Sequence, residues 1–258
     1  MSHTHGSDGT QRVASGLPRL AGLLLVCGGT AFSHAQSVAS WRQIPRPGPP
    51  ARSFHAMAYD EARQVAVLFG GVMLDGTLLG DTWEWDGAHW TQREVAGPPP
   101  CRGHVMTYDR QRGVVVLFGA GPSFNETWEW DGTAWTRREP VHRPRPQPVA
   151  THELGMVYDA ARNVSLLLDC SGTYSYPDWD PDHTRPRGAT WTWDGTDWTK
   201  LSAFGPLITS RVGMAFDIRR TVAVVFSCAV GPPQFEGAYF NDTWEWNGTQ
   251  WRCVVDHR

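Results

Sequence analysis

Lysine is almost absent from this chain. Of its 23 basic residues only Lys200 is a lysine, and 26 acidic residues leave a formal net charge of -3. A domain that binds nucleic acid usually shows a strong excess of positive charge. The composition therefore predicts no nucleic-acid partner.

The chain also lacks the apolar run of about 20 residues that a membrane-spanning helix needs. A shorter apolar stretch over residues 20–26 follows Arg12 and Arg19 and precedes the small-x-small site Ser33-His34-Ala35. These are the parts of a secretory signal. We therefore expect a signal peptide over residues 1–35, a domain without a transmembrane segment over residues 36–258, and a secreted or periplasmic location. The alternative is a lipoprotein attached through Cys27, which the preceding valine disfavours.

Familiar catalytic motifs are missing as well. The sequence contains no Gly-x-Ser-x-Gly, no His-Glu-x-x-His and no glycine-rich phosphate-binding loop. These absences disfavour the common serine hydrolases, zinc proteases and nucleotide-binding enzymes. The sequence predicts no catalytic residue and no cofactor.

Tryptophan, by contrast, is frequent and regularly placed. Twelve of the 14 tryptophans fall into four copies of one pattern, DTWEWDGAHW from Asp81, ETWEWDGTAW from Glu126, ATWTWDGTDW from Ala189 and DTWEWNGTQW from Asp242. In each copy two tryptophans stand two residues apart, on one face of an extended strand. The Asp-Gly or Asn-Gly pair that follows favours a β-hairpin, because both residues tolerate positive φ. The third tryptophan then lies on the returning strand.

A second recurring segment precedes each tryptophan pattern. It reads Met-x-Tyr-Asp or Met-x-Phe-Asp, then a turn with an arginine, then a valine-rich run, as in residues 57–60 and 65–69. Such runs are typical of strands covered on both faces. Each repeat therefore predicts four antiparallel strands, named a, b, c and d in chain order. Four-stranded units that recur every 45 to 63 residues are typical of a β-propeller.

The repeated tryptophans are expected to hold the sheets together. Each indole side chain buries about 150–250 Å² when it packs. We therefore assign a structural role, rather than stacking on a sugar, to Trp83, Trp85, Trp90, Trp128, Trp130, Trp135, Trp191, Trp193, Trp198, Trp244, Trp246 and Trp251.

The b strand that ends in Phe-Gly-Gly at residues 69–71, the later Asp-x-Trp and the tryptophan on strand d resemble the kelch repeat. The resemblance covers about Trp41 to Cys253 and implies an all-β fold, a kelch-like propeller of four recognisable four-stranded blades. The third and fourth copies depart from the pattern, because Asp169-Cys170 and Ser227-Cys228 replace the glycine pair. Kelch-like propellers serve as binding platforms, scaffolds and occasionally enzymes, so the resemblance implies a fold more than an activity.

An extra N-terminal strand complicates the count of blades. A segment near Trp41 resembles strand d, although the last repeat already has its own d strand at Trp251. The sequence leaves three arrangements open: a small or incompletely closed propeller, a fifth edge position filled by Trp41, and completion by self-association with another subunit.

Cysteine is scarce, with 5 residues in the chain. Cys101, Cys170, Cys228 and Cys253 would remain after removal of residues 1–35, and this even number permits two disulfides in an oxidising compartment. Cys170 and Cys228 occupy the same slot of neighbouring repeats, so we expect a bridge between these two. The alternative is a pair of small buried thiols.

The b–c and d–a connections vary in length and emerge together on one face, where binding usually resides. Arginines and histidines near the starts of the a strands form a candidate ring for an anionic ligand on this face: Arg52, His55, Arg102, His104 and Arg211. The alternative is that these side chains cap backbone carbonyls and hold the d–a loops.

The long third b–c loop, residues 171–188, supplies two further candidates. Trp179 lies outside the repeat pattern and is a candidate ligand contact. Asp178, Asp180 and Asp182 alternate as Ca²⁺ ligands do, but no turn glycine and no distal glutamate complete the set. We therefore expect no metal site, with calcium in this loop as the weak alternative to a solvated acidic loop.

Together these features predict an exported, non-catalytic binding module. It would use the b–c and d–a loop face to bind a protein or a glycan. The alternative is a propeller enzyme, either a metal-dependent oxidase or a glycan-active hydrolase.

Overall fold

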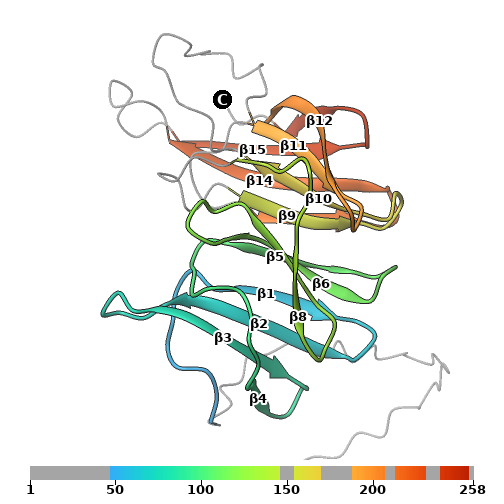
Figure 1. Ribbon diagram of the computed structural model, residues 1–258. Coiled ribbons are helices and arrows are strands. Elements are labelled where there is room, and N and C mark those ends of the chain that lie inside the picture. The colour runs from blue at the N-terminus through green and yellow to red at the C-terminus, as the bar shows by residue number, and fades with distance from the viewer. Residues whose placement is uncertain (1–46, 146–153, 170–187, 207–212, 231–238, 256–258) are drawn as a thin grey trace, which may run out of the picture. The chain divides into compact units, whose positions relative to one another are not determined.

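A computed structural model describes residues 47–145, 154–169, 188–206, 213–230 and 239–255. All of them belong to the unit Pro45–Arg258 of the chain. Their regular structure is entirely β, with no helix in these ranges (Figure 1). Consequently no helix in the described ranges could cross a membrane.

The strands form four antiparallel four-stranded sheets, and within each sheet neighbours in sequence are neighbours in space. The first sheet contains β1 (Ala56–Asp60), β2 (Val65–Val72), β3 (Leu78–Trp85) and β4 (Trp90–Arg93). The second contains β5 (Val105–Asp109), β6 (Val114–Ala120), β7 (Glu126–Trp130) and β8 (Trp135–Arg138). The third contains β9 (Leu154–Asp159), β10 (Val164–Asp169), β11 (Gly188–Trp193) and β12 (Trp198–Gly205). The fourth contains β13 (Gly213–Asp217), β14 (Val222–Val230), β15 (Tyr239–Trp246) and β16 (Trp251–Val255).

The all-β class and the four repeated a-b-c-d units are thus confirmed. The additional strand expected near Trp41 lies outside the described residues.

The hairpin between strands c and d differs in detail from the expectation. Trp85 pairs with Trp90, so the loop has four residues rather than two. Only the glycine adopts positive φ, 94° at Gly87, whereas the aspartate before it uses its carboxylate instead. Asp86 Oδ1 accepts hydrogen bonds from the backbone N–H groups of Ala88 and His89, at 2.7 and 2.6 Å. The aspartate is therefore selected as an acceptor for turn amides and not for left-handed backbone.

Consecutive sheets pack face to face. The a strands contact one another in chain order, β1 with β5, β5 with β9 and β9 with β13. We call the side of a sheet that meets the preceding sheet its leading face, and the side that meets the next sheet its trailing face. The b strands β2, β6 and β10 are almost wholly buried, as their valine-rich sequences predict.

Indole N–H groups on each leading face donate to the trailing face of the sheet before it. Trp130 Nε1 donates to Glu84 Oε1 at 3.0 Å, and Trp193 Nε1 repeats this bond to Glu129 Oε1 at 2.8 Å. The tryptophan on strand d bonds a threonine in the same way, as Trp135 Nε1 does to Thr82 Oγ1 at 2.9 Å. These bonds fix the angular position of one sheet on the next, in addition to the apolar area that the rings bury.

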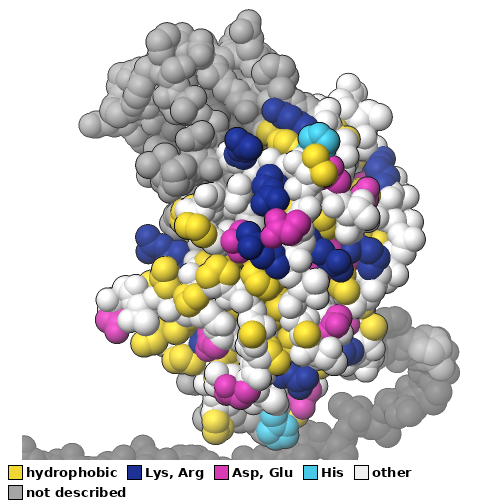
Figure 2. Space-filling view, in the orientation of Figure 1, with side chains coloured by type: hydrophobic (Ala, Val, Ile, Leu, Met, Phe, Trp, Pro, Cys, Tyr) yellow, Lys and Arg dark blue, Asp and Glu magenta, His cyan; other side chains and the backbone are white. Residues whose placement is uncertain are grey.

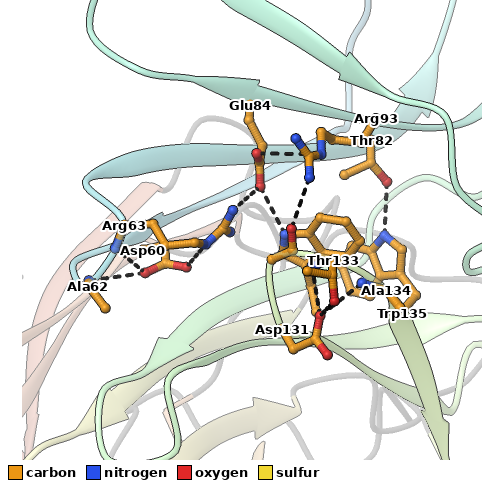
Figure 3. Close-up of polar contacts among 12 residues, drawn as sticks. Asp60, Ala62, Arg63, Thr82, Glu84, Arg93, Asp131, Thr133, Ala134 and Trp135 are labelled. Atoms are coloured by element: carbon orange, nitrogen blue, oxygen red, sulfur yellow. Dashed lines mark hydrogen bonds and ion pairs between the residues drawn. The ribbon is translucent and has the colours of Figure 1, made fainter.

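An ion network holds Glu84 in place (Figure 3), and Arg112 and Arg138 hold Glu129 in the same way. Arg63 Nε lies 2.7 Å from Asp60 Oδ2, and Arg63 Nη1 lies 2.6 Å from Glu84 Oε1. Arg93, on the other side of Glu84, also donates to the carbonyl oxygen of Gly132 in the next sheet, at 3.1 Å. The Asp-x-x-Arg turn and the Trp-Glu-Trp strand therefore act together as one connector between sheets.

The interface between the third and fourth sheets lacks part of this connector. Thr192 stands where the first two sheets have Glu84 and Glu129. Consequently Trp246 Nε1 is buried without a hydrogen-bond partner. The threonine bond is kept, since Trp251 Nε1 donates to Thr190 Oγ1 at 2.7 Å.

The described sheets form a propeller-like stack with two uncovered ends. Between β1 and β13 no contact is found, in the described part of the chain, that equals those between successive a strands. On β1, at the first end, Met57 and Tyr59 are exposed, whereas their counterparts Met106 and Tyr108 on β5 are buried.

Replacing Glu129 with alanine is expected to lower the free energy of unfolding by about 3 kcal/mol. The buried carboxylate accepts from Trp193 and from two arginines, Arg112 and Arg138, so its loss leaves three donors without their acceptor. Urea denaturation followed by tryptophan fluorescence measures the change.

The matched control is Glu61→Ala. Glu61 of the first sheet forms an ion pair with Arg110 of the second sheet at 2.6 Å, so it too connects neighbouring sheets. In this pair, however, both side chains are about half exposed. Such exposed pairs contribute little, so we expect a change below about 1 kcal/mol. Equal effects of the two substitutions would show that the buried network is not what holds the sheets together.

Candidate functional site

Arg52 is occupied within the fold. Its guanidinium makes two bonds to Asp81, Nη1 to Oδ1 at 2.6 Å and Nη2 to Oδ2 at 2.8 Å, and Nη1 also donates to the Gly70 carbonyl at 3.0 Å. The side chain is only 3% exposed. Burial raises the pKa of Asp81, but hydrogen bonds from Arg52 and Trp83 outweigh it and bring this pKa below its ordinary value. This geometry favours the alternative in which Arg52 holds the loop before β1.

His104 is a buried member of the same constellation. Its Nε2 lies 3.1 Å from the Phe69 carbonyl oxygen, and its Nδ1 lies 3.3 Å from Cys101 Sγ. Since only a protonated nitrogen can donate to the carbonyl, Nε2 carries the hydrogen and Nδ1 accepts from the thiol. Burial lowers the pKa of His104 to about 4. His104 therefore joins the second sheet to the end of β2.

The Cys101–His104 pair has the atoms of a nucleophilic dyad but the wrong electrostatics. Burial, with a smaller contribution from Glu126, raises the pKa of the Cys101 thiol to about 12. A reactive cysteine needs a lowered pKa and access to solvent. Cys101 is a free, buried thiol beside a neutral imidazole, so the pair is structural.

Two members of the ring, His55 and Arg102, are exposed near the starts of the first two a strands. Several candidate residues lie outside the described ranges, so the structure does not test them: Arg211, Trp179, Asp178, Asp180, Asp182 and Cys170 of the expected disulfide. Because Cys101 is a free thiol, two disulfides among the four cysteines are not formed. Within the described ranges no group of three or more His, Cys, Asp or Glu is placed to hold a metal ion.

The inner strands border a shallow cavity of about 340 Å³. The Met and Tyr or Phe positions of all four a strands contribute to its wall, so these strands share a central surface, as expected. Burial and the Asp60 carboxylate raise the pKa of Tyr108 on this surface. The Tyr108 hydroxyl therefore faces Asp60 of the first sheet, and the Tyr158 hydroxyl accepts from the backbone N–H of Gln111 in the second sheet at 3.3 Å.

A larger cavity, about 500 Å³, lies along the third sheet. The d–a connection after β8 forms one wall, and β11 and β12 form the other. Its lining combines cations with indole rings: Val141, His142, Arg143, Arg145, Trp191, Trp198, Thr199 and Lys200. Lys and Arg side chains gather over this part of the molecule, beside β11 and β12 (Figure 2).

A hydrogen-bonded pair anchors the wall made by the connection. Asp197, in the turn before β12, accepts from His142 Nδ1 at 2.7 Å and from the His142 backbone N–H at 2.8 Å. These bonds lower the pKa of Asp197, the side-chain bond most. Arg143 is held by Glu139, at 3.1 Å.

The first two sheets show which groups surround the first tryptophan of strand c. In the first, Asp81 Oδ2 accepts from Trp83 Nε1 at 2.6 Å and pairs with Arg52. In the second, Glu126 Oε2 accepts from Trp128 Nε1 at 2.9 Å, while its other oxygen lies 3.2 Å from an arginine on strand d. An indole N–H and a guanidinium thus share one carboxylate in both sheets.

The third sheet keeps the donors and lacks that carboxylate. Ala189 occupies the slot of Asp81 and Glu126. Trp191 Nε1 is buried without a hydrogen-bond partner, and Asp169, which pairs with Ala189 across the strands, makes no bond to it. Lys200, opposite Trp191 on β12, lies with Nζ 5.7 Å from the centroid of the indole ring. The arrangement is suited to a carboxylate supplied from outside the chain.

This cavity was not predicted from the sequence. Two signals point to it: alanine at a position that carries a carboxylate in the other three repeats, and the placement of the single lysine opposite a repeat tryptophan. The proximity of the d–a connection, which supplies Arg143 and Arg145, could not be read from spacing.

Comparison of the chain with protein-family models and with curated proteins finds no match.

His104 is expected to make stability depend on pH. Its pKa of about 4 in the folded protein lies below the 6.5 of a free imidazole. Between these values the unfolded chain binds the extra proton, so the stabilisation is complete above pH 6.5 and is lost as the pH falls through 4. A shift of this size corresponds to roughly 3 kcal/mol. Urea denaturation at a series of pH values measures the slope.

His104→Gln supplies the comparison, since an amide can donate to the Phe69 carbonyl and does not titrate in this range. We expect the variant to be less stable at pH 7 and to lose less stability on acidification. The NMR resonance of the His104 imidazole is identified as the one that is missing in this variant. If that resonance titrated near pH 6.5 in the native protein, the lowered pKa of His104 would be contradicted.

Proposed function

We propose that this protein is an exported, non-catalytic binding module with a kelch-like propeller fold, and that it binds a carboxylate-bearing protein or glycan in the cavity beside β12. One observation carries the proposal. The third sheet presents the indole and the cation that hold a carboxylate in the first two sheets, but it has Ala189 in place of the carboxylate.

The charge around the cavity supports an acidic ligand. Arg143, Arg145 and Lys200 all line it, while the nearby Asp197 is bonded to His142. Cations that converge on a partly enclosed cavity strengthen an ion pair, since less water screens it. Of the two lining indoles, Trp191 is partly exposed and offers flat apolar surface for a sugar ring or for a peptide side chain, whereas Trp198 is buried.

The proposed site includes the d–a connection after β8, but it differs from the ring of Arg52, His55, Arg102 and His104. Two of those four side chains are occupied within the fold. The expected contribution of the b–c loop over residues 171–188 is not tested, because all of these residues except Gly188 lie outside the described ranges.

Lys200→Glu is expected to weaken the binding of an acidic probe at least tenfold, about 1.4 kcal/mol. Isothermal titration with an oligogalacturonate and with an oligoglutamate peptide distinguishes a glycan from a protein ligand. The neutral counterparts of the two probes, a galacto-oligosaccharide and an oligoglutamine, should bind weakly. Lys200→Arg, which restores the cation that the second sheet has in this place, should retain affinity.

Arg219→Glu is the charge-matched control, because Arg219 is an exposed arginine in the turn before β14, outside the cavity lining. If both charge reversals weakened binding equally, the effect would be one of net charge. If native protein bound neither acidic probe, the proposal would fail.

Export is tested separately. When the full chain is produced in a bacterial host, the periplasmic or secreted protein should begin at Gln36, as removal of residues 1–35 predicts. N-terminal sequencing decides this. A chain that kept residues 1–35 in the cytoplasm would overturn the export part of the proposal and leave the binding part standing.

A further inference from the structure

The two end faces of the stack expose side chains that the interior sheets use to hold one another. On the leading face of the first sheet, Tyr59 is 55% exposed, against 8% for its counterparts Tyr108 and Tyr158. On the trailing face of the fourth sheet, Phe226 is 55% exposed, whereas Phe69 and Phe118 in the same slot are fully buried. Both ends thus have the composition of an interface.

The leading face of the first sheet retains the donor side of the connector. Trp85 and Trp90 form the same ring pair as in the other sheets, with centroids 5.5 Å apart, but both are only partly buried. Their hairpin turn is also uncovered. A Cβ built on Gly87 meets nothing within 4 Å, whereas a Cβ on Gly132 of the second sheet would stand 2.7 Å from Arg63 Nε.

The trailing face of the fourth sheet retains the acceptor side. Arg220 bonds Asp217 at 2.7 Å and also bonds Glu245, which reproduces the Asp60–Arg63–Glu84 network. Thr243 takes the slot of Thr82. Arg220 is more exposed than Arg63, because no hairpin turn lies over it in the described part of the chain.

We propose that a second copy of this chain docks head to tail, so that the trailing face of its fourth sheet covers the leading face of the first sheet. The acceptors Glu245 and Thr243 of one copy then meet the indole N–H groups of Trp85 and Trp90 of the other. These are the bonds that Glu84 and Thr82 make inside the chain.

The apolar groups match in the same way. Phe69 packs edge-on against Trp135, with ring centroids 5.3 Å apart. Phe226 is placed to pack likewise on Trp90 of the second copy, and Arg220 to cover the turn at Gly87. Both faces come from one chain and follow one repeat, so the occupant that satisfies every group is another copy.

Mutual docking of two copies covers both ends of each chain at once. A head-to-tail contact that did not close in this way would extend into a filament. We therefore expect a closed pair, which also removes the exposed edges of the stack.

Two single substitutions test the proposal on the full chain. Tyr59→Glu places a charge on the leading face, and Phe226→Glu places one on the trailing face, each at an exposed side chain. Leu74→Glu, at a fully exposed residue of the β2–β3 connection, is the matched control. Circular dichroism and urea midpoints verify that all three variants are folded.

Light scattering after size exclusion should give twice the mass of one chain for the native protein and for Leu74→Glu. Tyr59→Glu and Phe226→Glu should each dimerise about 30-fold more weakly, as at an interface hot spot. A mixture of these two variants should dimerise more strongly than either variant alone, because the trailing face of Tyr59→Glu and the leading face of Phe226→Glu form one interface without a substitution, while the second interface carries both.

If the native protein had the mass of one chain at all concentrations, the proposal would be overturned. The two end faces would then have to be covered within the same chain, either by each other or by residues 1–46. A dimer that survives both substitutions, or variants that stay single when mixed, would overturn it as well.

Discussion

The indole N–H bond to a buried carboxylate on the preceding sheet is the interaction on which this structure depends. Stacked sheets could slide or rotate over an apolar interface, because the hydrophobic effect has no direction. A hydrogen bond from Trp130 or Trp193 to a single oxygen does have direction. The arginine from the a–b turn and the arginine from strand d neutralise that carboxylate, so that it can be buried. Apolar packing provides the area and the polar bond sets the position.

A similar pairing of indole, cation and carboxylate occurs within each of the first two sheets, where Asp81 and Glu126 bond the first tryptophan of the pattern. The first two repeats thus place carboxylate acceptors at two equivalent positions. The third repeat has no carboxylate at either one, because Ala189 and Thr192 occupy them. The first change lies beside a basic cavity and the second lies inside a sheet interface. A departure from a repeat is informative only when the neighbouring groups are known.

Much of the fold could be predicted from the sequence, because the signals for it are local. The two-residue spacing of Trp83 and Trp85, the valine runs and the turn residues define strands without reference to distant partners. The hydrogen bonds and ion pairs that connect neighbouring sheets were harder to predict from the sequence. The sequence assigns no role to the turn arginine at Arg63, although this arginine repeats in all four units and a glutamate stands between the two tryptophans in three of them. Its role depends on contacts 21 residues away in sequence, which spacing alone does not reveal. The basic cavity depends on how the connection after β8 returns past β11 and β12, and no periodic signal records that path.

The missing glutamate at Thr192 has a consequence for how the molecule comes apart. A buried N–H without a partner, as at Trp246, costs about 1–3 kcal/mol. In a linear array each unit is held only by its neighbours, so the weakest junction decides where cooperativity breaks. We therefore expect the fourth sheet, β13 to β16, to be the least protected part of the stack and the first to open under partial denaturation, while the three sheets before it stay assembled.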